Sequence, residues 1–217
     1  MEKSSNSLQL EFFFDYSCPW AYVAFNRARE AAMRTGAQML WKPILLDRVF
    51  EAVNPALLET QFDPRPRNAS YQAKDLRDWA RFCGLKIARP YHWPDDVELA
   101  LRGAIVALEY NVIEPFSRRV FEAYFGAQED INQVRVLLGI TVACGLDKNR
   151  FQQRIADADT LVQLQHNTDD LVERGGFGCP TMFIGDDMYF GNDRMPLVEM
   201  ALARASGLRF SMPGQHG

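Results

Sequence analysis

Residues 12–25 read FFFDYSCPWAYVAF. The aromatic run belongs to a short apolar segment, LQLEFFF over residues 8–14, which predicts a buried strand. Pro19 suits the first turn of a helix and Gly36 suits its end, so we expect a helix between them. A second strand is expected over residues 38–46, QMLWKPILL. Two strands joined by a helix form a βαβ unit, so these strands should be parallel.

Cys18 lies at the turn between the first strand and the first helix. A dithiol oxidoreductase would have a Cys-x-x-Cys sequence here, but this chain has Ala21 in place of the second cysteine. A helix N-terminus favours negative charge and can activate a thiol, and a thiol there can also donate a hydrogen bond to another thiolate. A lone cysteine is usually a small buried residue. Here Pro19 and the strand–turn–helix context favour a catalytic role for Cys18.

The rest of the chain is helical in its middle and returns to strands at its end. Residues 54–68 are rich in proline and predict a loop. Helical periodicity then predicts helices over residues 71–85, 96–110, 114–125, 131–146 and 147–175. The segments PTMFIG and DMYFG flank a turn at residues 185–187 and predict an antiparallel hairpin. The segment DRMPLVEMALARASG predicts a last helix with Asp193 as its N-cap.

The expected order of elements is βαβ, then helices, then ββα. This order predicts an α/β protein with a thioredoxin-like fold that is split by an all-helical insertion. We assign residues 1–50 and 175–217 to the thioredoxin-like domain. Residues 51–174 are assigned to the insertion, together with the loop that leads into it.

Composition narrows the class of protein. The chain has 217 residues, is 47% hydrophobic and carries a net charge of −4 without a basic run, so we expect no nucleic-acid partner. No apolar run approaches the roughly 18 residues that span a bilayer, and no signal peptide is recognised, so we expect a cytoplasmic protein without a membrane partner. Cys18, Cys83, Cys144 and Cys179 should then stay reduced. Their spacing is not that of zinc ligands, so we expect no metal site.

Two further motifs could form a binding site. In GGFGCPTMFIG, Pro180 opens a strand, at the place where a thioredoxin-type fold has a cis proline facing the redox turn. Cys179 before it could offer its backbone N–H and C=O to an extended peptide, although a proline can also simply begin an edge strand. In FGNDRM, Asn192 and Asp193 open the last helix, where they could hold an anion or a ligand ammonium. Helix capping alone would also explain Asp193.

Together these motifs resemble the 2-hydroxychromene-2-carboxylate isomerase family, which is kin to the kappa-class glutathione transferases in the DsbA-like branch of thioredoxin folds. The resemblance runs along nearly the whole chain. It is carried by FFFDYSCPWAY, NPALLE, YQAKDLRDWA and GGFGCPTMFIGDDMYFGNDRM. It implies glutathione as the cofactor, a small aromatic carboxylate as the substrate and a homodimer.

The resemblance also implies a role for each matched residue. The family has serine in place of Cys18, and that serine is thought to donate a hydrogen bond to the glutathione thiolate. Asn54 matches an asparagine that contacts glutathione, and Cys179, before the cis Pro180, pairs with the glutathione backbone. The matched residues that bind the γ-glutamyl end of glutathione are Asn192 and Asp193.

A family lysine falls at Asn68, and whether Asn68 or the adjacent Arg67 replaces it stays open. The role of Cys18 is open as well. A neutral thiol would imitate the serine as a weaker hydrogen-bond donor, whereas a reactive thiol would form a mixed disulfide with glutathione.

These motifs are compatible with three functions. The first is glutathione-dependent cis–trans isomerisation of a conjugated aromatic 2-oxo acid, or a kappa-type transfer, with Trp20 and Tyr22 among the aromatic walls that hold a flat acid. The second is a DsbA-like thiol–disulfide oxidoreductase with Cys18 as its single nucleophile. The third is a non-catalytic module that binds extended peptides. Cys179 could also resolve a disulfide on Cys18, or it could be a small apolar residue in place of valine.

Overall fold

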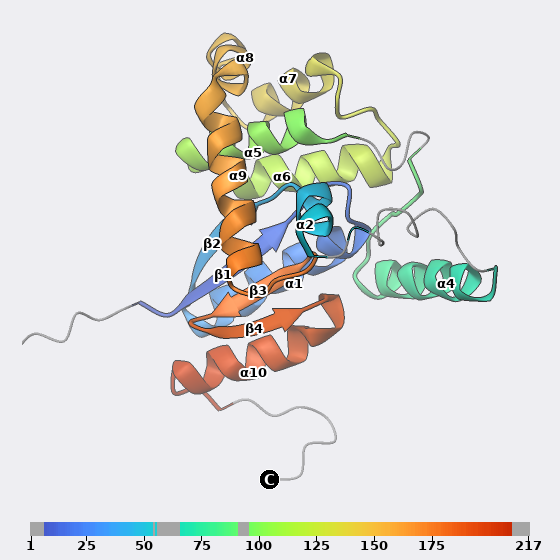
Figure 1. The fold of residues 1–217 in the computed structure, drawn as a ribbon, viewed down its shortest axis with the longest axis vertical. Coiled ribbons are helices and arrows are strands. Elements are labelled where there is room, and N and C mark those ends of the chain that lie inside the picture. The colour runs from blue at the N-terminus through green and yellow to red at the C-terminus, as the bar shows by residue number, and fades with distance from the viewer. Residues whose placement is uncertain (1–6, 54, 56–65, 91–95, 210–217) are drawn as a thin grey trace, which may run out of the picture.

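The structure is a computed structural model of the chain. It describes residues 7–53, 55, 66–90 and 96–209. A four-stranded sheet, in the order β2–β1–β3–β4, forms its centre (Figure 1). The strands are β1 (Gln9–Phe14), β2 (Gln38–Pro43), β3 (Thr181–Ile184) and β4 (Asp187–Phe190). β1 and β2 are parallel, with Gln9 opposite Gln38, whereas β3 is antiparallel to both β1 and β4.

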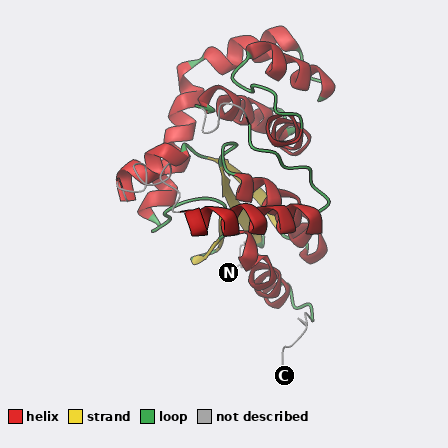
Figure 2. Cartoon of the chain, turned by 90° about the vertical axis from the view of Figure 1, so that its right-hand side faces the viewer, coloured by secondary structure: helices red, strands yellow, loops and turns green. Residues whose placement is uncertain are grey.

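The helix α1 (Pro19–Thr35) joins β1 to β2, and α10 (Met195–Ala205) follows the hairpin of β3 and β4. Gly36 ends α1 in the left-handed conformation, with φ of 70°, as its position in the sequence predicts. α1 and α10 pack against each other, and Figure 2 shows the strands lying among helices. The predicted βαβ, helices, ββα order and the thioredoxin-like fold class are therefore confirmed.

The three consecutive phenylalanines that end β1 point to both faces of the sheet and are covered on both. Phe12 and Phe14 contact Trp41 edge to face, at centroid distances of 5.5 and 6.3 Å. Phe13 packs against Phe183 instead, under the guanidinium of Arg174 from the last helix before β3. All three phenylalanines are fully buried. β1 is thus covered on both faces, the arrangement that produces a continuous apolar run rather than an alternating one.

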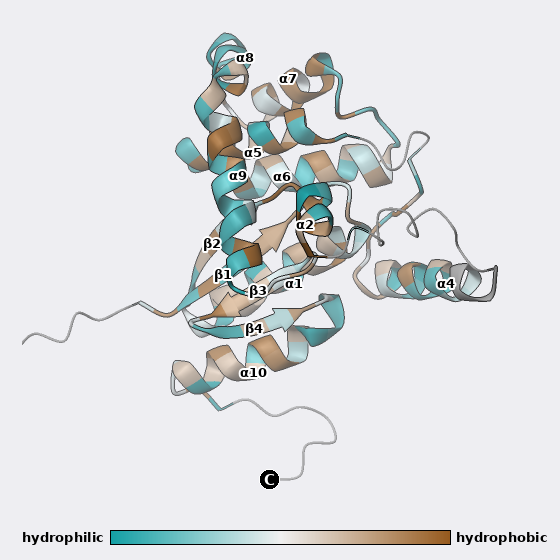
Figure 3. Ribbon diagram, in the orientation of Figure 1, coloured by the Kyte–Doolittle hydropathy of each residue, from teal (hydrophilic) through white to brown (hydrophobic). Residues whose placement is uncertain are grey.

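Between β2 and β3 the described chain is helical. Its helices are α2 (Leu46–Val53), α4 (Pro66–Phe82), α5 (Glu98–Glu109), α6 (Ile113–Phe121), α7 (Val134–Ala143), α8 (Lys148–Ala156) and α9 (Ala158–Glu173). A π-helical turn, Glu122–Gly126, follows α6. In Figure 3 these helices carry both hydrophobic and hydrophilic residues, the pattern of helices that bury one face. The division of the chain into two domains stays a prediction.

Two elements differ from the sequence expectation. The second strand ends at Pro43, although a strand was expected as far as Leu46, and Leu46 begins α2, a helix that was not expected. The Leu45 N–H donates to Thr168 Oγ1 at 3.0 Å, and the Leu46 N–H donates to Asp15 Oδ2 at 3.0 Å. Because these two amides pair with distant side chains, they cannot form the hydrogen bonds that would extend β2.

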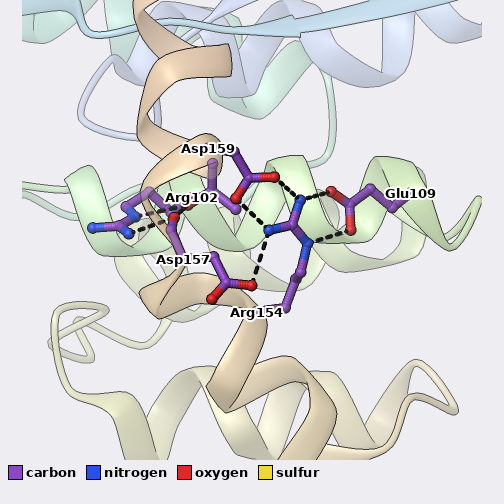
Figure 4. A network of polar contacts seen from close by, with 6 residues as sticks. Arg102, Glu109, Arg154, Asp157 and Asp159 are labelled. Atoms are coloured by element: carbon purple, nitrogen blue, oxygen red, sulfur yellow. Dashed lines mark hydrogen bonds and ion pairs between the residues drawn. The ribbon is translucent and has the colours of Figure 1, made fainter.

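The helix expected over residues 147–175 is interrupted at Asp157, where the backbone is extended with ψ of 135°. The Asp157 carbonyl accepts hydrogen bonds from Thr160 Oγ1 and Arg102 Nη2, at 2.8 and 3.0 Å. Beside the break, Arg154 pairs with Glu109, Asp157 and Asp159 (Figure 4). The break is thus fixed by contacts between helices, which periodicity alone does not show. Among the described residues, no helix is both long and apolar enough to cross a membrane.

Candidate functional site

Cys18 is the N-cap of α1. Its backbone is extended, and its carbonyl accepts hydrogen bonds from the N–H groups of Ala21 and Tyr22, at 3.1 and 3.3 Å. Pro19 occupies the first turn of the helix, where its missing N–H costs no hydrogen bond. The Cys18 side chain is therefore held at the N-terminal end of α1, directly after the turn that follows β1. It is nearly buried, with 7% of the residue exposed.

The structure brings Cys18 next to Cys179, although the two residues are 161 positions apart. The Cys18 thiol donates a hydrogen bond to the Cys179 carbonyl, with 3.3 Å between sulfur and oxygen. The peptide bond between Cys179 and Pro180 is cis, and β3 begins directly after it. Burial, followed by the contact with the Cys18 thiol, raises the pKa of Cys179 well above its ordinary value. Cys179 is therefore a neutral thiol at physiological pH.

Asp15 is a buried acid of this site that was not considered in the sequence analysis. Its Oδ1 accepts hydrogen bonds from the N–H and the hydroxyl of Ser17, both at 2.7 Å. Its Oδ2 accepts one from the N–H of Leu46 at 3.0 Å. The carboxyl group thus joins the turn that carries Cys18 to the start of α2. An acidic residue directly after three phenylalanines was the available signal, because a charge at the end of a buried strand needs partners.

Burial raises the pKa of Asp15 from 3.8 to about 6, against the lowering effect of its hydrogen bonds. The folded state therefore keeps the Asp15 proton to a higher pH than the unfolded state does. Stability should fall as pH rises from about 4 to about 6 and then level off, by about 3 kcal/mol in total from this group. Denaturant unfolding of wild type and Asp15→Asn between about pH 4 and pH 6 would measure this change in stability. The difference in unfolding free energy between them should change with pH, and the same difference at every pH would contradict the assignment.

Asn192 is buried and is held by Arg27 of α1. One guanidinium nitrogen, Arg27 Nη1, donates to both the Asn192 side-chain oxygen and its backbone oxygen, the latter at 3.0 Å. The guanidinium group also lies over the ring of Trp79 of α4, 4.9 Å from its centroid. Arg27 was not considered in the sequence analysis, because its partner lies 165 positions away. It fixes the direction in which the Asn192 carboxamide faces.

Asp193 is not the N-cap of the last helix, so that expectation was wrong. Residues Asn192–Arg194 form a 3-10 turn, and α10 begins only at Met195. The Asp193 carboxylate is more than half exposed and pairs with Arg194 at 2.7 Å. Gly191, with φ of 100°, makes room for it, because a Cβ there would lie 2.7 Å from Asp193 Oδ1.

A backbone hydrogen bond joins this turn to the cis proline. The Gly191 N–H donates to the Pro180 carbonyl at 2.9 Å. The structure thus connects Cys18 to Cys179 directly, and Pro180 to the turn that carries Asn192 and Asp193. In the described part of the chain, no group of three His, Cys, Asp or Glu side chains is placed to hold a metal ion.

The remaining residues predicted for the site lie either outside the described part of the chain or against the hydrophobic core. Asn54 and the side chains of Arg67 and Asn68 lie outside the described part of the chain. Tyr22 is buried and stacks on Phe121 at 5.2 Å, so it belongs to the core rather than to a ligand wall. Trp20 is partly buried and packs against the same core.

Comparison with known proteins agrees with this geometry. Residues 9–203 match the family described as DSBA-like thioredoxin domain. A 2-hydroxychromene-2-carboxylate isomerase of Pseudomonas putida is 26% identical over 207 residues, which cover 90% of this chain and 94% of the relative. A glutathione S-transferase kappa 2 of Caenorhabditis elegans is 26% identical over 216 residues, covering 91% and 93%.

A solved structure of 2-hydroxychromene-2-carboxylate isomerase superposes with a TM-score of 0.79 at 25% sequence identity. The match covers 91% of this chain and 96% of that chain. The resemblance inferred from the sequence motifs is therefore confirmed, and the chain belongs to the DSBA-like thioredoxin domain family.

Proposed function

We propose that this protein is a glutathione-dependent isomerase of the 2-hydroxychromene-2-carboxylate type, which converts the cis and trans forms of a conjugated aromatic 2-oxo acid. The observation that carries the proposal is the hydrogen bond from the Cys18 thiol to the Cys179 carbonyl, beside Pro180. A sulfur donor at a helix N-terminus next to a peptide-binding backbone suits a ligand that is both a peptide and a thiol. The name of the similar kappa-class glutathione S-transferase supports the same ligand, and the name of the similar isomerase supports the reaction.

In this proposal glutathione lies extended along the segment before β3. Its cysteinyl N–H and C=O pair with the C=O and N–H of Cys179, as a neighbouring strand would. The Cys18 thiol then leaves the Cys179 carbonyl, which it occupies in the free protein, and donates to the glutathione thiolate. The N-terminus of α1 stabilises the same negative charge.

The turn at the start of α10 holds the other end of glutathione. The exposed Asp193 carboxylate exchanges Arg194 for the γ-glutamyl ammonium group. Since Arg27 binds the oxygen of the Asn192 carboxamide, the amide nitrogen is left to donate to the γ-glutamyl carboxylate.

Glutathione is regenerated at the end of the reaction. The thiolate adds to the conjugated system of the 2-oxo acid, and the attacked double bond becomes a single bond that rotates. Elimination restores the double bond in its other geometry and releases the thiolate. Cys18 stabilises the sulfur charge before addition and after elimination and forms no bond to the substrate.

Titration calorimetry with reduced glutathione tests the binding step. We expect binding by wild type and a loss of about tenfold or more in affinity for Asp193→Ala, because a charge-assisted hydrogen bond is removed. Asp186→Ala, in the exposed hairpin turn, is the matched control and should bind as wild type does. Absence of binding at millimolar glutathione would reject the proposal, and equal affinity of the two variants would reject the role of Asp193.

A further inference from the structure

We propose that Cys18 and Cys179 form a redox-active dithiol, in which Cys18 attacks a small-molecule disulfide and Cys179 resolves the resulting mixed disulfide. This activity is distinct from isomerisation and does not require it. The second thiol of such a pair normally lies on the same helix turn, where this chain has Ala21. The fold supplies the second thiol from the segment before β3 instead.

The geometry of the pair supports the proposal. Both cysteines are free thiols and nearly buried, with 7% and 6% of each residue exposed. The Cys18 thiol donates to the Cys179 carbonyl, with 3.3 Å between the Cys18 sulfur and the carbonyl oxygen. The Cys18 thiol is therefore in contact with the residue that carries the second thiol. Disulfide formation then requires the two Cβ atoms to lie about 3.5–4.5 Å apart.

The two positions suit different roles. Cys18 is at the N-terminus of α1, the position of the attacking thiol in a dithiol turn, so it is the attacking group. Burial holds Cys179 in its neutral form, so it keeps its proton until Cys18 has reacted. Once Cys18 carries an RS group, its sulfur is an electrophile beside Cys179, the residue that carries the second thiol.

The electrons and atoms balance with a disulfide RSSR as the oxidant. The Cys18 thiolate attacks one sulfur of RSSR, the S–S bond breaks, and the first RS⁻ leaves and takes up the proton that Cys18 had lost. Cys179 then gives up its proton, attacks the Cys18 sulfur and expels the second RS⁻, which leaves as RSH. Two electrons pass from the protein thiols to RSSR, and the protein keeps a Cys18–Cys179 disulfide. An excess of free thiol reverses both steps.

The test uses bis(2-hydroxyethyl) disulfide, which lacks every peptide group of glutathione, so its outcome is separate from glutathione binding. The full-length reduced protein is treated with this disulfide, alkylated, and analysed by intact mass and peptide mapping. From the Cys18–Cys179 pair, wild type should release two equivalents of 2-mercaptoethanol and lose two hydrogens, with no adduct on either cysteine. Mapping should find the peptides of Cys18 and Cys179 linked to each other.

Variants separate the two steps. Cys179→Ser and Cys179→Val should each release one equivalent and retain an adduct on Cys18, whereas Cys18→Ser should form no disulfide and carry no adduct at the site. Cys144→Ser, which changes a partly exposed cysteine outside the site, should behave as wild type. Circular dichroism checks that each variant is folded. The proposal is overturned if wild type stops at the Cys18 adduct, or if the cross-link contains Cys83 or Cys144.

Discussion

Replacing Cys18 with alanine should lower kcat/KM for glutathione-dependent isomerisation by about 100-fold, the loss typical of one hydrogen-bond donor to a reacting anion. Cys18→Ser should instead be as active as wild type or more so, because a hydroxyl is a better donor than a thiol. The measurement is a spectroscopic assay of a conjugated aromatic 2-oxo acid at saturating reduced glutathione, with a parallel assay that lacks glutathione.

This pair of variants also separates the two roles of Cys18. If serine and alanine abolish the reaction equally, the thiol acts as a nucleophile and the oxidoreductase interpretation is favoured. If alanine leaves the rate unchanged, Cys18 does not contact the glutathione sulfur. Cys144→Ser serves as the control for the loss of a thiol elsewhere, because Cys144 is a partly exposed cysteine at the end of α7 and outside the site.

Replacing Arg27 with methionine should raise KM for glutathione about tenfold or more with little change in kcat. Arg27 contacts neither the candidate thiol nor Cys179, but it donates to both oxygens of Asn192. Hydrogen bonds from a charged donor are worth about 1.5–3 kcal/mol, and their loss leaves the buried carboxamide free to turn away from its binding direction. Methionine keeps an apolar stem under Trp79, so packing is disturbed least.

The control for this prediction is Arg34→Met on the same helix. Arg34 forms an exposed ion pair with Glu199 at 2.8 Å and has no contact with Asn192, so its loss should leave KM unchanged. Arg27→Lys should recover part of the affinity, because an ammonium group can still reach an oxygen but cannot reproduce the fixed guanidinium geometry. An equal rise in KM for both methionine variants would show a general structural effect and contradict the positioning role.

Much of the fold was predictable because its signals are local. A short strand rich in aromatic residues, a proline at a helix start, a glycine at the helix end and a short hairpin turn each specify their element without distant partners. The meeting of Cys18 and Cys179 was also predictable, since in a thioredoxin-like fold the residue before the cis proline faces the thiol turn. That expectation depended on the order of elements rather than on any contact visible in the sequence.

The features that were missed depend on contacts between distant residues. α2 begins where it does because the Leu46 N–H pairs with Asp15, 31 positions earlier. The break at Asp157 depends on Arg102, and the direction of Asn192 depends on Arg27. Asp193 satisfied the rule for a helix N-cap, but a 3-10 turn displaced the helix start to Met195. Local patterns do not contain these pairings, so only the folded structure reveals them.

The central claim is that glutathione binds along Cys179–Pro180 with its sulfur beside Cys18. A crystal structure with reduced glutathione tests it most directly. We expect the cysteinyl backbone of glutathione to pair with the N–H and C=O of Cys179, its sulfur to lie within hydrogen-bonding distance of Cys18 Sγ, and its ammonium group to contact Asp193. Glutathione bound away from Pro180, or bound there with its sulfur directed away from Cys18, would contradict the account.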